Sequence, residues 1–261
     1  MGRRPGRDQA LSLVALPLWT WALGGALLGL IAGSFLATLV LRWPKGEGVS
    51  RGRSHCDHCG RAIKARDLVP LISYAWLHGK CRTCGAEIDR SHIVIETLCA
   101  LIGGAAMFVA PGQAGFMGAL FGWLLVALAA LDLKHFWLPD RLTASLALVG
   151  IASGLTGLAP PILDRAIGAA AGYGTLALIA VTYRWFRKRE GLGGGDPKML
   201  GAIGAMLGWQ GLPFVLLGAS SVGLLYVTMR IASGNKIHAT DRLPLGALMA
   251  LAAFPLWMIQ Q

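Results

Sequence analysis

Two aspartates at the edges of apolar segments are the residues of this 261-residue chain best placed for acid–base chemistry. Asp132 ends an apolar stretch, and Asp196 stands in the sequence GGGDPK, just before the apolar stretch that opens at Met199. A bare carboxylate near hydrocarbon is costly, so it should have a partner or a function. Two carboxylates at one site do not both ionise readily, so one keeps its proton and the pair offers an acid and a base. Such a pair can activate water and polarise a peptide carbonyl without a metal.

The residues around Asp196 suit a site for an extended chain. Gly193 and Gly195 carry no side chains, so a substrate backbone could lie against this loop. One alternative is a glycine-rich turn in which Asp196 caps a helix. Another is a proton-coupled transporter, but that function would favour carboxylates near the bilayer midplane rather than at segment edges. Lys198 and Asp140 lie at the same edge, where they could tune the site, bind phosphate headgroups or simply be solvated.

Four cysteines in two C-x2-C pairs, separated by 21 residues, predict a tetrahedral structural zinc site. The predicted ligands are Cys56, Cys59, Cys81 and Cys84. A glycine follows each pair, which lets backbone amides turn toward the sulfurs. Two disulfides are an alternative that a reducing cytoplasm disfavours, and no thioredoxin-like pattern supports redox chemistry. His55 and His58 are expected to be solvated neighbours, and Cys99 a packed core residue.

The composition predicts an all-α polytopic membrane protein. Hydrophobic residues make up 55%, mean hydropathy is +0.58, and 14% of residues are charged, against about a quarter in soluble domains. About eight transmembrane segments are expected, at residues 18–41, 93–109, 116–132, 142–158, 166–183, 199–207, 212–231 and 243–259. The sixth is shorter than the roughly 20 residues that a span needs, so it is either a half-span or continuous with the seventh.

The distribution of Lys and Arg predicts the orientation. With the N-terminus outside, 20 of the 24 basic residues fall on the cytoplasmic side, and the others are Arg3, Arg4, Arg7 and Arg165. This places the cysteine insert and both aspartates at the cytoplasmic face. The net charge of +11 then reflects topology and contacts with anionic lipids rather than nucleic-acid binding. Three parts are expected: 1–41 with the first segment, 42–92 as the zinc-binding insert, and 93–261 as the remaining membrane domain.

Several motifs together resemble the type IV prepilin peptidases, which are membrane aspartic peptidases of the GxGD kind. GSFLATLVLRWP at 33–44 is similar to the opening motif of that family, and the cysteine pairs with the residues between them resemble its cytoplasmic domain. LDLKHFWLPD at 131–140 and GLGGGDPKMLGAIGAMLGW at 191–209 resemble the segments that carry its catalytic aspartates. The resemblance covers nearly the whole chain and assigns the catalytic positions to Asp132 and Asp196.

The resemblance implies an enzyme of the bacterial inner membrane that acts on prepilins or pseudopilins. It implies cleavage of a basic leader after a glycine, and N-methylation of the new terminus by S-adenosylmethionine. The methyl transfer rests on the resemblance alone, because no glycine-rich dinucleotide fingerprint is present; Glu96 and Asp67 are candidate participants. The alternatives are a zinc-ribbon membrane transporter or scaffold without proteolytic activity, and a peptidase that has lost methyl transfer.

Overall fold

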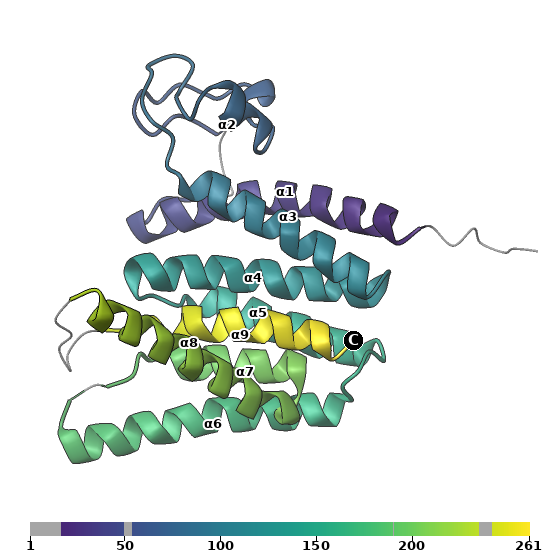
Figure 1. The fold of residues 1–261 in the computed structure, drawn as a ribbon, viewed down its shortest axis with the longest axis vertical. Coiled ribbons are helices and arrows are strands. Elements are labelled where there is room, and N and C mark those ends of the chain that lie inside the picture. Colours follow the sequence, from purple (N-terminus) through teal and green to yellow (C-terminus); the bar gives the residue numbers. More distant parts are fainter. Residues whose placement is uncertain (1–16, 50–53, 190, 235–241) are drawn as a thin grey trace, which may run out of the picture.

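The computed structural model describes residues 17–49, 54–189, 191–234 and 242–261, so the basic tail at 1–16 lies outside the described residues. Each of the eight predicted apolar segments forms a helix, and the described residues contain no strand beyond isolated bridges (Figure 1). The helices are α1 (Leu18–Arg42), α3 (Ser91–Val109), α4 (Gln113–His135), α5 (Asp140–Leu155), α6 (Ile162–Arg187), α7 (Gly195–Leu207), α8 (Leu212–Ala232) and α9 (Leu245–Ile259). The all-α prediction is therefore confirmed.

Five of the described helices are long and apolar enough to cross a membrane. These are α1, α3, α4, α6 and α8, counted with the short 3-10 turns that adjoin α1 and α8. The other three are shorter, with 16 residues in α5, 13 in α7 and 15 in α9. The chain is thus an integral membrane protein, and the total of eight spans stays a prediction.

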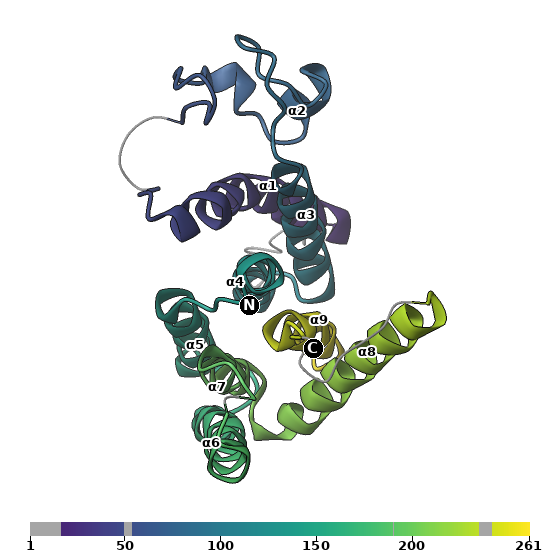
Figure 2. The same cartoon turned by 90° about the vertical axis from the view of Figure 1, so that its left-hand side faces the viewer.

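The short helix α7 lies inside the bundle. Apart from Gly195 and Lys198, all its residues are buried, and it packs against α5, α6 and α9 (Figure 2). It does not continue into α8, because Gly208 adopts φ +74° and a 3-10 turn, Trp209–Gly211, follows. Small residues allow the close packing: a Cβ added at Gly172 would lie 2.6 Å from the Leu200 carbonyl oxygen.

A buried arginine joins α5, α6 and α7 at one end of the bundle. The Arg165 side chain, 1% exposed, donates hydrogen bonds to the carbonyls of Gly150 on α5 and of Ala205 and Met206 on α7. It also donates to the loop carbonyls of residues 158–160. Arg165, which the charge distribution assigns to the outer side, is thus buried inside the bundle, and backbone oxygens enclose its positive charge.

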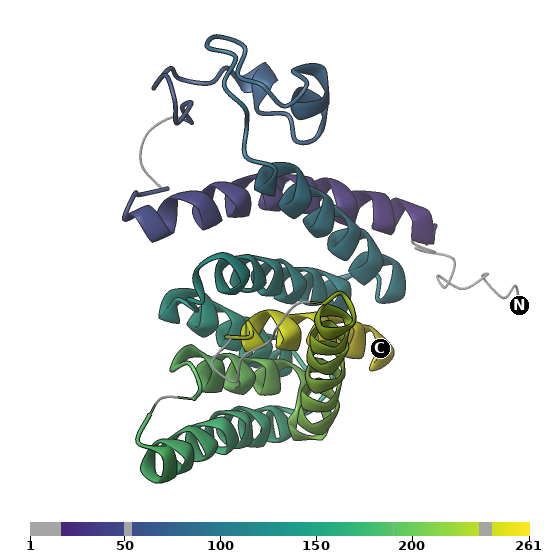
Figure 3. The same ribbon diagram turned by 60° about the vertical axis from the view of Figure 1, so that its left-hand side comes forward.

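The segment between α1 and α3 forms the insert, which lies beyond these two helices, away from the rest of the bundle (Figure 3). It contains the 3-10 turns Trp43–Lys45 and Ala65–Asp67 and the short helix α2 (Ile72–Trp76). Below it, α1 and α3 approach closely at glycines, since a Cβ added at Gly33 would lie 2.7 Å from Glu96 Cα. The insert is thus mounted on a tightly packed pair of helices.

Candidate active site and metal centre

The structure brings the two aspartates together from separate helices. Asp132 lies on the last turn of α4 and Asp196 on the first turn of α7, and both are buried. A Cβ added at Gly246 would lie 2.9 Å from Asp132 Oδ2 and 3.0 Å from both methyl carbons of Leu138, so Leu138 lies near Asp132. Leu138, in the link between α4 and α5, packs beside Gly195, next in sequence to Asp196. The result is a pair of carboxyl groups enclosed at one end of the bundle.

Each aspartate accepts a hydrogen bond from a backbone amide. The Gly193 N–H donates to Asp196 Oδ2 at 3.1 Å, and the Ala247 N–H donates to Asp132 Oδ2 at 2.9 Å. Asp196 does not cap α7, because the N-cap position is Gly194 and no side chain makes a capping bond there. The helix-cap alternative is therefore wrong. The second oxygen of each carboxylate has no hydrogen bond within the described residues.

The glycines beside Asp196 are required by close packing. A Cβ added at Gly193 would lie 3.0 Å from Asp196 Oδ2, and one added at Gly195 would lie 2.7 Å from Leu138 Cβ. Both distances are shorter than ordinary carbon contacts, so a side chain at either position would displace the carboxylate or the α4–α5 link. The loop therefore keeps a bare backbone next to the two carboxyl groups.

Lys198 and Asp140 form an exposed ion pair near the same end of the bundle. Lys198 Nζ lies 2.6 Å from Asp140 Oδ1, which ties the first turn of α7 to the first residue of α5. Exposed pairs of this kind contribute up to about 1 kcal/mol. The two residues thus support the arrangement of the helices that carry and flank Asp196.

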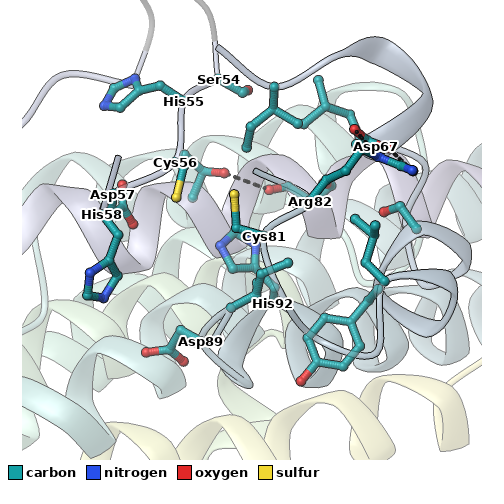
Figure 4. A pocket seen from close by; sticks show the side chains of 18 of the residues that line it. Ser54, His55, Cys56, Asp57, His58, Asp67, Cys81, Arg82, Asp89 and His92 are labelled. Atoms are coloured by element: carbon teal, nitrogen blue, oxygen red, sulfur yellow. Dashed lines mark hydrogen bonds and ion pairs between the residues drawn. The ribbon is translucent and has the colours of Figure 1, made fainter. Parts of the chain in front are cut away.

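The four predicted cysteines converge in the insert. Their sulfurs all lie within 4.8 Å of one another, and Cys56 Sγ is 3.9 Å from Cys84 Sγ. Tetrahedral zinc with Zn–S bonds of about 2.3 Å requires sulfur separations of about 3.8 Å, so the donor set fits zinc. All five cysteines are free thiols, which argues against the disulfide alternative. Neither His55 nor His58 belongs to the ligand group, and their rings point away from the Cys56 and Cys81 sulfurs (Figure 4).

The two cysteine pairs share one local fold. In each, the first cysteine N–H bonds to a carbonyl five residues later, and the amide of the following glycine bonds back to the cysteine carbonyl. Gly60 and Gly85 adopt φ +67° and +72°, a left-handed conformation that glycine accepts readily. Backbone amides of Cys84 and Thr83 lower the pKa of the Cys81 thiol to about 6, which favours a thiolate ligand. Cys99 is buried in the helical core, as predicted.

A cavity of about 740 Å³ lies between the insert and the ends of α1 and α3 (Figure 4). Asp67 and Glu96 both line it. Arg82 bonds to both carboxylate oxygens of Asp67 and lowers the pKa of that carboxyl group, and the Nη2–Oδ1 distance is 2.7 Å. Glu96 is 6% exposed, and its Oε2 accepts the Leu71 N–H at 2.9 Å. The two predicted residues therefore belong to one cavity, each already holding a partner.

Two contacts near the aspartates are not evident from sequence. Lys134, two residues after Asp132, bonds to Ser91 and lies 3.6 Å from Asp89, which links α4 to the end of the insert. The second contact is the Ala247 amide described above. Backbone atoms are present in every residue, so the only sequence signal for this contact was a proline and a glycine, Pro244 and Gly246, where α9 begins.

Comparison with known families gives two matches that follow each other along the chain. The bacterial peptidase A24 N-terminal domain matches residues 27–110, and the type IV leader peptidase family matches residues 119–228. The first match covers most of α1, the insert and α3, and the second runs from α4 into α8. No solved structure matches the chain.

Curated bacterial relatives named prepilin leader peptidase/N-methyltransferase match over most of their length. The protein of Aeromonas hydrophila is 37% identical, covering 87% of each chain. That of Pectobacterium carotovorum subsp. carotovorum is 34% identical over 89% of this chain and 90% of the relative, and that of Stutzerimonas stutzeri 32% identical over 93% and 91%. These matches argue against a transporter or scaffold without enzymatic activity. The chain therefore belongs to the type IV leader peptidase family and is an enzyme of the leader peptidase/N-methyltransferase class.

Proposed function

We propose that the protein is an aspartic endopeptidase in which Asp132 and Asp196 activate one water molecule. The observation that carries this proposal is that two buried carboxyl groups, from α4 and α7, lie around Leu138 at the same end of the bundle. One carboxylate takes a proton from water, and the oxygen attacks the peptide carbonyl carbon. The other carboxyl group protonates the carbonyl oxygen, and a proton then passes to the leaving amine as the C–N bond breaks. No metal is needed for these steps.

The proposed substrates are type IV prepilins or pseudopilins, as the names of the relatives imply. We infer cleavage of the basic leader after a glycine, as the family resemblance implies, with the bare backbone of residues 193–195 beside the scissile bond. The excess of Lys and Arg predicts that the insert and both aspartates lie at the cytoplasmic face of the bacterial inner membrane. A substrate with its leader in the cytoplasm and its apolar helix in the bilayer would then present its scissile bond at the depth of the aspartates. The other basic residues would contact anionic lipids, and nucleic acid is not among the expected partners.

The four cysteines are proposed to hold a structural zinc ion. Their sulfur separations suit Zn²⁺. Among the described residues 54–90, every residue except Gly79 is half-buried or exposed, so burial alone stabilises the insert little. The ion would supply folding free energy and keep the shape of the cavity beside it. The peptidase steps proposed above do not involve it.

The cavity between the insert and α1–α3 is the proposed site for S-adenosylmethionine. Its volume lies within the range of about 300–1,000 Å³ that is usual for small-molecule sites. Carboxylates such as Glu87 and Glu96 suit the cationic sulfonium and ammonium groups, and Tyr74 offers an aromatic face. If bound there, S-adenosylmethionine would supply the methyl group for the new N-terminal amine, and the residues that line the cavity would hold it. Asp67 and Glu96 would act by shaping this cavity through Arg82 and Leu71.

The peptidase proposal is tested with purified protein and a peptide that has a basic leader, a glycine and an apolar segment. Asp132→Asn and Asp196→Asn should each reduce cleavage by at least about 10³-fold, while thermal unfolding stays close to that of the unmodified protein. Asp140→Asn, an exposed carboxylate at the same end of the bundle, is the matched control and should retain activity within about threefold. Mass spectrometry would locate the cleavage and detect a methyl group when S-adenosylmethionine is added. Cleavage by either of the first two variants at the normal rate would overturn the proposal.

A further inference from the structure

The last helix, α9, reaches the candidate active site through its first turn. The Ala247 N–H lies 2.9 Å from Asp132 Oδ2 in a buried hydrogen bond, and Gly246, just before it, also lies against this carboxylate. The type IV leader peptidase match ends at residue 228, whereas α9 spans Leu245–Ile259. This helix therefore contributes to the site from outside the matched region.

The amides of the first turn suit this contact for a general reason. The first N–H groups of a helix have no acceptor within that helix, so they are available to another group. Asp132 lies on the last turn of α4, where the dipole of its own helix disfavours negative charge. The N-terminal end of α9 has the opposite polarity and offsets this effect, so the charged form of Asp132 depends on α9.

Gly246 allows the two helices to approach this closely. A Cβ added at this position would lie 2.9 Å from Asp132 Oδ2 and 3.0 Å from both methyl carbons of Leu138. Leu138 also limits the space beside Gly195, the neighbour of Asp196. Leu138 therefore packs against both α7 and α9. It sets the distance between the loop that carries Asp196 and the first turn of α9, whose Ala247 amide binds Asp132.

We propose that the first turn of α9 is a positioning element of the active site, in which the Ala247 N–H orients and stabilises the Asp132 carboxylate and Gly246 permits the contact. This inference rests on the proposed peptidase activity. Neither residue needs to touch the substrate, so their loss should affect turnover more than binding. The loss of turnover should also vary with pH, because it depends on the protonation of the aspartates. A general loss of stability would not produce this pH dependence.

Ala247→Pro tests the hydrogen bond, because proline has no N–H and is tolerated in the first turn of a helix. It should lower kcat by about 10- to 100-fold with KM within about threefold, as expected for loss of one hydrogen bond to a charged group. The acidic limb of the kcat profile should move to higher pH, because the carboxylate loses a donor that favours its charged form. Asp196, the other titratable group at this site, is unchanged in this variant, so the shift would come from the loss of the Ala247 N–H at Asp132. Ala247→Gly keeps the N–H and should retain kcat within about threefold.

Gly246→Ala provides a second test if Ala247→Pro fails to fold. It should lower kcat without raising KM, whereas Gly174→Ala, where an added Cβ meets nothing within 4 Å, should not. Normal kcat in both α9 variants, with Asp132→Asn inactive, would overturn the role of α9 and leave the peptidase proposal standing. Normal cleavage by Asp132→Asn would overturn the peptidase proposal itself.

Discussion

The cysteine insert and the helical bundle are stabilised in different ways. In the insert, residues 54–90 have half-buried or exposed side chains, and its defining feature is a cluster of four sulfurs. In the bundle, α7 is almost wholly buried, and glycines bring helix backbones into contact. We therefore expect the insert to depend on a metal ion held by the four cysteines and on polar contacts. The bundle instead depends on glycines that let its helices pack closely where they cross. The two candidate sites should therefore fail independently.

Removing the metal should produce the largest difference in stability between the insert and the bundle. Structural zinc contributes about 10–16 kcal/mol in small zinc-dependent folds, so a Cys56→Ser/Cys59→Ser variant should lose its metal, the fold of the insert and methyl transfer. Helix content and thermal unfolding of the bundle should change little, and cleavage should fall much less than methylation. Metal analysis, circular dichroism and the two activity assays measure these effects. Cys99→Ser, outside the cluster, is the control and should retain about one zinc per chain. A full complement of zinc in the double variant would contradict the assignment.

Crowding a helix crossing should have a smaller effect, and on the bundle alone. A Cβ at Gly204 would press on the Gly168 carbonyl, where α7 meets α6. Gly204→Ala should therefore destabilise the bundle by about 1–3 kcal/mol, the usual cost of overpacking, and lower cleavage because α7 carries Asp196. Thermal unfolding in detergent measures the change, with Gly174→Ala as the uncrowded comparison. If zinc content fell while bundle stability stayed normal, the two regions would not be independent in this way.

The smallest effect is expected from the Asp67–Arg82 pair in the insert. Hydrogen bonds from Arg82 lower the pKa of Asp67 below its usual value, so the pair stabilises the folded insert above about pH 4 and loses this effect only as pH falls further. Asp67→Asn should make the insert slightly more sensitive to limited proteolysis. The difference from the unmodified protein should be the same at pH 5 and pH 8. A difference that disappears between these values would show that the pKa of Asp67 is not lowered.

Periodicity and residue type were sufficient to predict the helices and to single out residues that the structure then brings close together. Eight apolar stretches became eight helices because a run of apolar residues in a membrane must satisfy its own backbone hydrogen bonds. The spacing of Cys56, Cys59, Cys81 and Cys84 was informative because few other patterns bring four thiols together. Asp132 and Asp196 stood out because carboxylates are rare among such segments.

The contacts that hold these groups could not be predicted in the same way. Glu96 was singled out for chemistry, but its carboxylate also holds the Leu71 amide, a contact that depends on how the insert folds back onto α3. The hydrogen bond from the Ala247 amide to Asp132 joins residues 115 positions apart in the chain. Its donor is a backbone N–H, which nearly every residue has. Side-chain identity carries no information on such backbone donors, so the structure was needed to find them.

The enclosed Arg165 has a consequence for the order in which the protein is assembled. A guanidinium entering a bilayer alone costs several kcal/mol. Four of its carbonyl acceptors, on Gly150 and residues 158–160, precede Arg165 in the chain and have been synthesised when α6 forms. The carbonyls of Ala205 and Met206 emerge some forty residues later. The α5–α6 hairpin thus provides carbonyl acceptors for the Arg165 guanidinium as it inserts into the membrane. The carbonyls of α7 complete this set of hydrogen bonds when that helix packs against the hairpin.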